Sequence, residues 1–139
     1  MGKKILVECL QSLIHEHAGK NLHFTLVMLI PTESAVIDSY YNLVFSAPWL
    51  DSYELKEAID LMIKAIIRQL GTTDSPAFRK INCVNAVRSD GAFVNELTSA
   101  FTVSNDVVTI DNYYINGVLI ERAFLLESHS SELQLLAEA

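Results

Sequence analysis

The sequence predicts an α+β fold in which two long helices lie on one face of a mainly antiparallel sheet. Three observations favour this fold: an amphipathic helical pattern near the N-terminus, a stronger one over residues 55–70, and two apolar stretches on either side of Asn116-Gly117. The chain has 139 residues, a usual length for one domain, and no linker or internal repeat divides it. We therefore expect a single domain over residues 1–139, with the element order α-β-β-α-β-β-β-β-α.

The first helix and the first two strands follow from the spacing of apolar residues. A helix is predicted over residues 3–18, where Leu6, Leu10, Leu13 and Ile14 share one face and Gly19 follows as a stop. Apolar residues then alternate with others over 22–30 and 39–46, which is typical of strands. A turn region with Pro31 separates them, so we expect the two strands to form an antiparallel hairpin.

The second helix has the clearest pattern in the sequence. Asp51 is a suitable N-cap, and Glu54 three residues later has the spacing of a capping box. Gly71 is placed to end the helix. The residues of its apolar stripe are Leu55, Ile59, Met62, Ile63, Ile66 and Leu70.

The segment between this helix and the last apolar stretches is less distinct. Residues 72–76 are predicted to be a loop, residues 80–88 a strand, and Ser89-Asp90-Gly91 a turn. The run 92–103 fits a helix through Phe93, Leu97 and Phe101, and it also fits a twisted strand. We expect a strand there, because the segments on both sides have strand patterns.

A C-terminal hairpin is predicted by Asn116-Gly117, the favoured pair for a two-residue type I′ turn. This turn places Ile115 opposite Val118, Tyr113 opposite Ile120, and Asp111 opposite Arg122. The opposite charges of the last pair support the register independently. Residues 131–136 have capping-box spacing before three leucines and are predicted to form a short final helix.

Apolar residues occur on both faces of this predicted hairpin, which suggests that something covers each face. The two long helices can cover one face. Half of all residues are hydrophobic, which is high for so small a domain, so a second subunit is our candidate for the other face. The residues expected at such an interface are Tyr113, Tyr114, Ile115, Leu119 and Ile120.

Charge and targeting signals limit the partners and the compartment. The net charge of −7 disfavours nucleic acid as a partner, because binding to phosphates depends on clustered lysine and arginine. We expect no membrane association, since no apolar stretch approaches the length of a membrane span and the start of the chain lacks a signal-peptide core. Cys9 and Cys83 lie among apolar neighbours, as buried reduced thiols do. These features predict a cytoplasmic protein.

No motif in the sequence commits the chain to a reaction. Glycine-rich phosphate loops and the serine-nucleophile pattern do not occur. His15 and His17 are two residues apart and point away from each other on a helix, whereas a zinc-protease helix needs histidines four apart. We therefore expect no cofactor, no metal and no catalytic residue, and the sequence leans against an enzyme.

Two functions are consistent with these observations. The first is a protein-interaction module that forms a homodimer or binds another protein. The second is a small-ligand-binding protein or an enzyme acting on an anionic metabolite, with a pocket near Trp49, Arg68, Arg79 and Arg88. These four residues also have structural explanations. Trp49 can pack as a lid over a helix start, and the arginines can pair with the acid-rich C-terminal half of the same chain or of a second copy.

Overall fold

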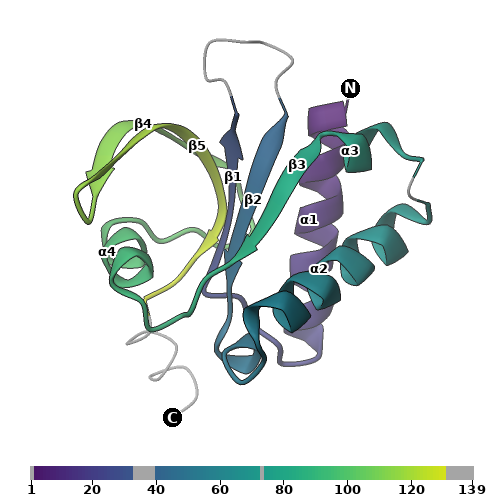
Figure 1. Cartoon of the computed structure of the whole chain (residues 1–139), viewed down its shortest axis with the longest axis horizontal. Coiled ribbons are helices and arrows are strands. Elements are labelled where there is room, and N and C mark those ends of the chain that lie inside the picture. Colours follow the sequence, from purple (N-terminus) through teal and green to yellow (C-terminus); the bar gives the residue numbers. More distant parts are fainter. Residues whose placement is uncertain (1, 33–39, 73, 131–139) are drawn as a thin grey trace.

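Five strands form one sheet with helices on both of its faces in the computed structural model, which describes residues 2–32, 40–72 and 74–130 (Figure 1). Helices α1 (Gly2–Gly19) and α2 (Leu55–Leu70) lie on one face. Helix α4 (Ala92–Ala100) lies on the other. The predicted α+β class, with both long helices on the same face of the sheet, is confirmed.

The strand order is β3-β2-β1-β5-β4. Its members are β1 (Leu26–Pro31), β2 (Tyr41–Ser46), β3 (Ile81–Ala86), β4 (Val108–Ile115) and β5 (Val118–Ser128). Neighbouring strands are antiparallel except β2 and β3, which run parallel. The crossover between these two strands contains α2, as a parallel pair requires. The expected β1–β2 pairing is confirmed.

The larger core lies between the sheet and the two long helices. Leu6, Leu10 and Leu13 of α1 are fully buried, and Ile66 of α2 is buried against them. Two short helices, η1 (Pro48–Leu50) and α3 (Pro76–Arg79), flank α2. Apolar spacing along α1 therefore predicted its buried face correctly. The predicted stripe of α2 is right at Met62 and Ile66 but wrong at Leu55, which is exposed, and it omitted the buried Ala58 and Ala65.

The C-terminal end of α2 matches the prediction, whereas its N-terminal end does not. Gly71 ends the helix with φ +80, a left-handed conformation that glycine adopts without strain. At the start, the predicted capping box is wrong: the N-cap is Glu54, which makes no side-chain capping bond. Asp51 hydrogen bonds to Ser89 instead, because the turn after β3 folds against the loop before α2.

The strand expected over residues 92–103 is wrong, since residues Ala92–Ala100 form helix α4. Val94, Leu97 and Thr98 are its buried residues, at helical spacing. They pack on the second face of the sheet, against residues of β1, β4 and β5. The local pattern fitted both structures, and burial against this face favours the helix.

The C-terminal hairpin has the predicted register. Ile115 pairs with Val118, Tyr113 with Ile120, and Asp111 with Arg122. Asn116 and Gly117 have φ values of +50 and +77, as a type I′ turn requires. The Nε atom of Arg122 lies 2.8 Å from Oδ1 of Asp111, so the cross-strand ion pair is also confirmed.

The hairpin curls around α4 (Figure 1). Ile110 and Ile115 would face opposite sides of a regular strand, yet both are buried in the same cluster as Leu97. Asn112 lies between them with φ +50, outside the extended region, although the pairing register with β5 continues on both sides of it. At the tip, the backbone N–H of Asn116 donates to the Glu96 carboxylate of α4. The second face of the hairpin is therefore covered in part by the chain itself.

Three further predictions concern the two cysteines, the C-terminal helix and membrane-spanning segments. Cys9 is buried as predicted, but the prediction for Cys83 is wrong, since this residue of the edge strand β3 is exposed. The helix predicted over residues 131–136 lies outside the described residues. Within the part of the chain that the structure describes, no helix combines the length and the apolar character needed to cross a membrane.

Candidate functional site

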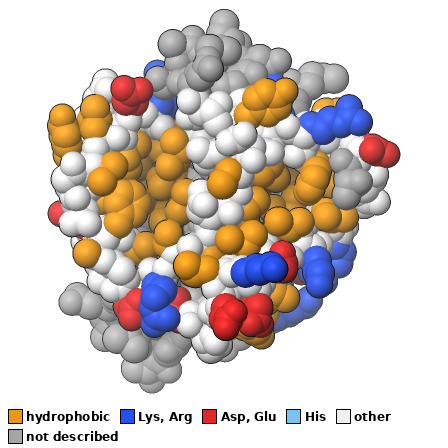
Figure 2. Space-filling view, in the orientation of Figure 1, with side chains coloured by type: hydrophobic (Ala, Val, Ile, Leu, Met, Phe, Trp, Pro, Cys, Tyr) orange, Lys and Arg blue, Asp and Glu red, His pale blue; other side chains and the backbone are white. Residues whose placement is uncertain are grey.

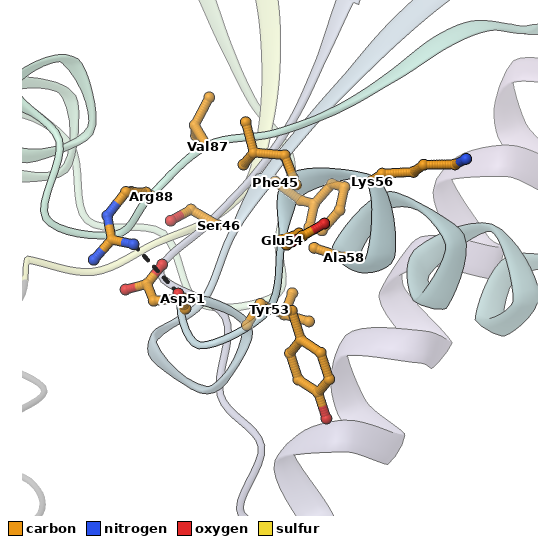
Figure 3. Close-up of a pocket in the computed structure, with 12 residues that line it drawn as sticks. Phe45, Ser46, Asp51, Tyr53, Glu54, Lys56, Ala58, Val87 and Arg88 are labelled. Carbon is orange, nitrogen blue, oxygen red and sulfur yellow. Dashed lines mark hydrogen bonds between the residues drawn. The ribbon is translucent and has the colours of Figure 1, made fainter.

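A pocket of about 460 Å³ opens where β2 and β3 end and α2 begins (Figure 3). Its volume is in the range of small-ligand sites, about 300–1,000 Å³. In sheets with parallel strands, ligands commonly bind beyond the carboxyl ends of those strands. The parallel pair β2–β3 thus places its loops where a binding site is expected.

The pocket has apolar walls and a polar side. Phe45 points toward α2 because alternate residues of β2 face the larger core. The apolar lining residues are Phe45, Leu50, Leu55, Ala58, Ala86 and Val87. The polar lining residues are Ser46, Asp51, Tyr53, Glu54, Lys56 and Arg88.

The side chain of Asp51 joins the two loops at the pocket. Its carboxylate accepts the backbone N–H of Ser89 at 3.0 Å and also the Ser89 hydroxyl. The backbone carbonyl of Asp51 accepts Nη1 of Arg88 at 3.3 Å, the bond drawn in Figure 3. Both carboxylate oxygens are thus used to hold the turn after β3 against the loop before α2.

Arg88 is held by a second acid, Asp90. Its Nε atom donates to Oδ1 of Asp90 at 3.0 Å and its Nη2 atom to Oδ2 at 3.3 Å. Hydrogen bonds from Arg88, together with its positive charge, hold the pKa of Asp90 below the usual range. Both side chains are exposed, so this pair contributes little to stability. Its main effect is to occupy the guanidinium that faces the pocket.

Ser46 is the residue of the pocket whose polar group is not satisfied. Its side chain projects from the end of β2 toward Arg88 (Figure 3). Among the described residues, its Oγ is the one buried side-chain oxygen or nitrogen without a hydrogen-bond partner. A buried hydroxyl in that state costs about 1–3 kcal/mol, and such groups in native structures call for an explanation.

Trp49 lies away from this pocket. Its ring stacks on His17 at 5.7 Å between centroids and meets Phe24 edge-on at 5.6 Å. The indole Nε1 donates to the backbone oxygen of His23 at 3.0 Å. Trp49 therefore packs as a lid, and it does so over the end of α1 rather than over the start of α2.

The three predicted arginines each lie beside an acid of the same chain. Arg68 lies 3.4 Å from Glu16, and Arg79 lies 3.9 Å from Asp74. Of the predicted ligand residues Trp49, Arg68, Arg79 and Arg88, the pocket brings in Arg88 alone. Asp90, the partner of Arg88, lies in the acid-rich C-terminal half that was the expected partner, whereas Glu16 and Asp74 lie outside it. An anion would have to compete with those acids at each position.

The predicted interface residues divide into two groups. Tyr114 is 68% exposed, and Tyr113 and Leu119 are also exposed. Ile115 and Ile120 are buried in the cluster beneath α4, so they are not available to a partner. Alternation along the hairpin contributes to this division, because Ile115 and Ile120 lie on one face, toward α4, and the pair of Tyr114 and Leu119 lies on the other.

The His15-Glu16-His17 segment has a structural role. Nδ1 of His17 lies 2.8 Å from the Leu13 carbonyl oxygen, one turn back in α1. Glu16 forms ion pairs with Lys20 and Arg68 and accepts a hydrogen bond from Gln69 of α2. Across the described ranges, no group of three or more histidine, cysteine or acidic side chains is placed to hold a metal ion.

Sequence reasoning missed Ser46 and the pocket around it. The lining comes from the ends of β2 and β3 and from the start of α2, which are distant in the sequence and carry no local motif. The connection after β2 contains Pro48 and Trp49, but neither residue lines the pocket. Comparison with protein-family models, with curated proteins and with solved structures finds no match to this chain.

Proposed function

We propose that this chain binds a small molecule in the pocket formed by the ends of β2 and β3 and the start of α2. The observation that carries the proposal is a pocket of about 460 Å³ whose accessible lining is mainly apolar, with polar side chains on one side. Natural ligand sites combine these features: mainly apolar lining with a small number of placed polar groups.

The lining favours recognition over catalysis. A general acid or base must be free to exchange a proton with the reacting group. The carboxylate of Asp51 is occupied by Ser89, and the guanidinium of Arg88 is occupied by Asp90 and by the Asp51 carbonyl. We therefore propose a binding protein, and the apolar lining residues with accessible surface, Leu55 and Val87, supply the ligand's apolar contacts.

The proposal is tested by screening a small-molecule fragment library against the ¹⁵N-labelled protein by NMR. We expect hits that shift the amide signals of residues 45–58 and 86–88. The variant Leu55→Trp narrows the pocket entrance, because Leu55 lines the pocket and is exposed. It should weaken those hits at least tenfold.

The matched control is Leu61→Trp, which changes an exposed leucine of the same helix outside the pocket lining. Its hits should match those of the unchanged protein. Hits that map elsewhere, or that persist equally in both variants, contradict the proposal. A library without any hit at this pocket also contradicts it.

A second candidate function is self-association through the outer side of the C-terminal hairpin. Tyr114 and Leu119 form a cross-strand pair, and both are exposed together with Val118 at the turn. β4 is an edge strand, so two copies can pair the same edge around a twofold axis. Figure 2 also shows apolar side chains across one face of the molecule, with charged side chains mainly at its rim.

The structure removes one of the reasons for expecting self-association. The hairpin was expected to need a second subunit over one face, but α4 covers much of that face. Light scattering after size exclusion tests the candidate at micromolar concentration. We expect a dimer that becomes a monomer in the double variant Tyr114→Lys/Leu119→Lys and remains a dimer in Leu61→Lys. A monomer of the unchanged chain contradicts it.

A further inference from the structure

The last described residues of the chain lie close to the pocket. Strand β5 ends at Ser128, which pairs with Leu26 at the start of β1. The N–H of His129 then donates to the Thr25 carbonyl at 2.9 Å, and the N–H of Thr25 donates to the Ser46 carbonyl at 2.8 Å. Neighbouring strands lie about 4.8 Å apart, so the backbone of His129 lies roughly 10 Å from that of Ser46, at the edge of the pocket.

An exposed apolar surface borders the pocket at the start of α2, where residues 52–57 are all exposed. Leu55 is 56% exposed, more than any other leucine, isoleucine or valine that the structure describes. Tyr53 is 45% exposed, and its ring points away from the strand ends (Figure 3). Both residues line the pocket, and we call them the entrance surface. Grouped exposed apolar side chains, unlike isolated ones, are typical of interaction sites.

Residues 131–139 follow the described part of the chain and have the composition of a segment that docks on such a surface. They include Leu133, Leu135 and Leu136. On the helix that the sequence predicts over residues 131–136, Leu133 and Leu136 share one face, because residues three apart are neighbours on a helix. A helix of this length is not stable unless it packs on another surface.

The length of this segment suits the path to the entrance surface. From the end of β2 the chain continues to Tyr53 through η1, where the N–H of Leu50 and that of Tyr53 each donate to a carbonyl three residues back. These turns keep Tyr53 near the end of β2. Nine residues span roughly 13 Å as a helix and roughly 30 Å when extended. Residues 131–139 can therefore reach the start of α2 from His129.

We propose that residues 131–136 dock on the entrance surface of the same chain and cover the pocket. Leu133 and Leu136 contact Tyr53 and Leu55, and burial of these apolar side chains stabilises the contact. The contact does not depend on the proposed small-molecule function, because it forms without a ligand. If a ligand binds in the pocket, the docked segment must first move aside.

Amide signals of the ¹⁵N-labelled full chain test the docking from the side of the segment. The double variant Leu133→Lys/Leu136→Lys should shift the signals of residues 53–56, because it removes the apolar contact with the entrance surface. The matched control is Leu135→Lys, on the other side of the predicted helix, and it should leave those signals in place.

The reciprocal variants test the docking from the side of α2. Leu55→Lys should shift the signals of residues 132–137, which are distant from it in the sequence. Leu61→Lys changes another exposed leucine of the same helix outside the pocket lining and should leave those signals unchanged. Both leucines are exposed, so neither substitution disturbs the core.

Three outcomes would overturn the docking. The first is that the signals of residues 53–56 do not move in the double variant. The second is that the shifts are confined to α4 or to the C-terminal hairpin, which would place the segment on the other face of the sheet. The third is that the signals of residues 53–56 in the unchanged chain move on dilution, which would assign the contact to a second copy.

Fragment binding separates the covering of the pocket from the proposed function. Library fragments that shift the pocket amides should bind at least about twofold more tightly to the double variant, because a segment docked in more than half of the molecules lowers the apparent affinity by that fraction. Equal affinities would show that the segment does not cover the pocket. If no fragment binds to either protein, the proposed function fails, and the amide shifts still decide the docking.

Discussion

The carboxylate of Asp51 accepts the backbone N–H of Ser89 at 3.0 Å, across 38 positions of the sequence. This bond ties the loop before α2 to the turn after β3. Both segments border the pocket, so the shape of its polar side depends on this contact. Ser89 is buried, which shields the bond from water and makes its loss more costly.

Replacing Asp51 should therefore destabilise the chain. We expect Asp51→Ala to lower the free energy of unfolding by about 1–3 kcal/mol, because the Ser89 N–H and hydroxyl lose a charged acceptor. Urea unfolding monitored by circular dichroism measures the change. Asp74→Ala is the control, since that exposed acid forms one ion pair at 3.9 Å and should change stability by less than about 0.5 kcal/mol. Equal effects of the two variants would contradict the expectation.

Helix α4 is expected to shield the second face of the sheet. Leu97 is fully buried between this helix and the hairpin, so Leu97→Ala should cost about 2–5 kcal/mol of unfolding free energy. The loosened contact should also increase binding of a hydrophobic dye under native conditions. Leu61→Ala on the outer side of α2 is the control and should do neither. Unchanged stability in Leu97→Ala would mean that α4 does not pack on the hairpin.

Replacement of glycine by alanine should have opposite effects at Gly117 and at Gly19. Gly117 has φ +77 in the hairpin turn, so Gly117→Ala should destabilise the chain by about 1–2 kcal/mol. Gly19 at the end of α1 lies outside the left-handed region and has open space where the methyl group of an alanine would stand. Gly19→Ala should therefore leave stability unchanged or raise it by up to about 1 kcal/mol. Thermal unfolding measures both, and equal losses would contradict the turn type.

The two cysteines should differ in reactivity. Burial raises the pKa of the Cys9 thiol to about 11, whereas Cys83 is exposed on the edge strand β3. At pH 8 a thiol reagent should label Cys83 within minutes and Cys9 only after unfolding, because the thiolate is the reacting form. The raised pKa also implies that stability present below pH 9 is lost as the pH rises toward about 11. Peptide mass spectrometry identifies the labelled position, and rapid labelling of Cys9 would contradict its burial.

Local sequence was sufficient wherever neighbours along the chain decide the structure. Asn116-Gly117 predicted the turn, the register and the Asp111–Arg122 ion pair, since a two-residue loop leaves one way to pair the strands. The apolar stripe of α2 predicted the buried positions Met62 and Ile66, although Leu55 at the first turn is exposed. These predictions depend on contacts within one hairpin or within one helix.

Local sequence was insufficient wherever a distant contact chose between two structures. Residues 92–100 fit a helix or a strand by spacing, and packing of Leu97 on the sheet favours the helix. Asp51 had the right position to cap α2, but Ser89 competes for its carboxylate. In both cases the partner lies on another element, so its position does not follow from the pattern.

The sequence by itself determined the fold class, the two long helices and the C-terminal hairpin, because apolar spacing and turn residues act within a few positions of each other. Only the tertiary structure decided that α4 covers the second face and that Arg88 and Ser46 meet at one pocket while Trp49, Arg68 and Arg79 lie elsewhere. The physical reason is that a binding pocket consists of side chains from chain ends and loops that meet only after the strands have paired. Their proximity is a property of the packed sheet, and no spacing along the chain encodes it.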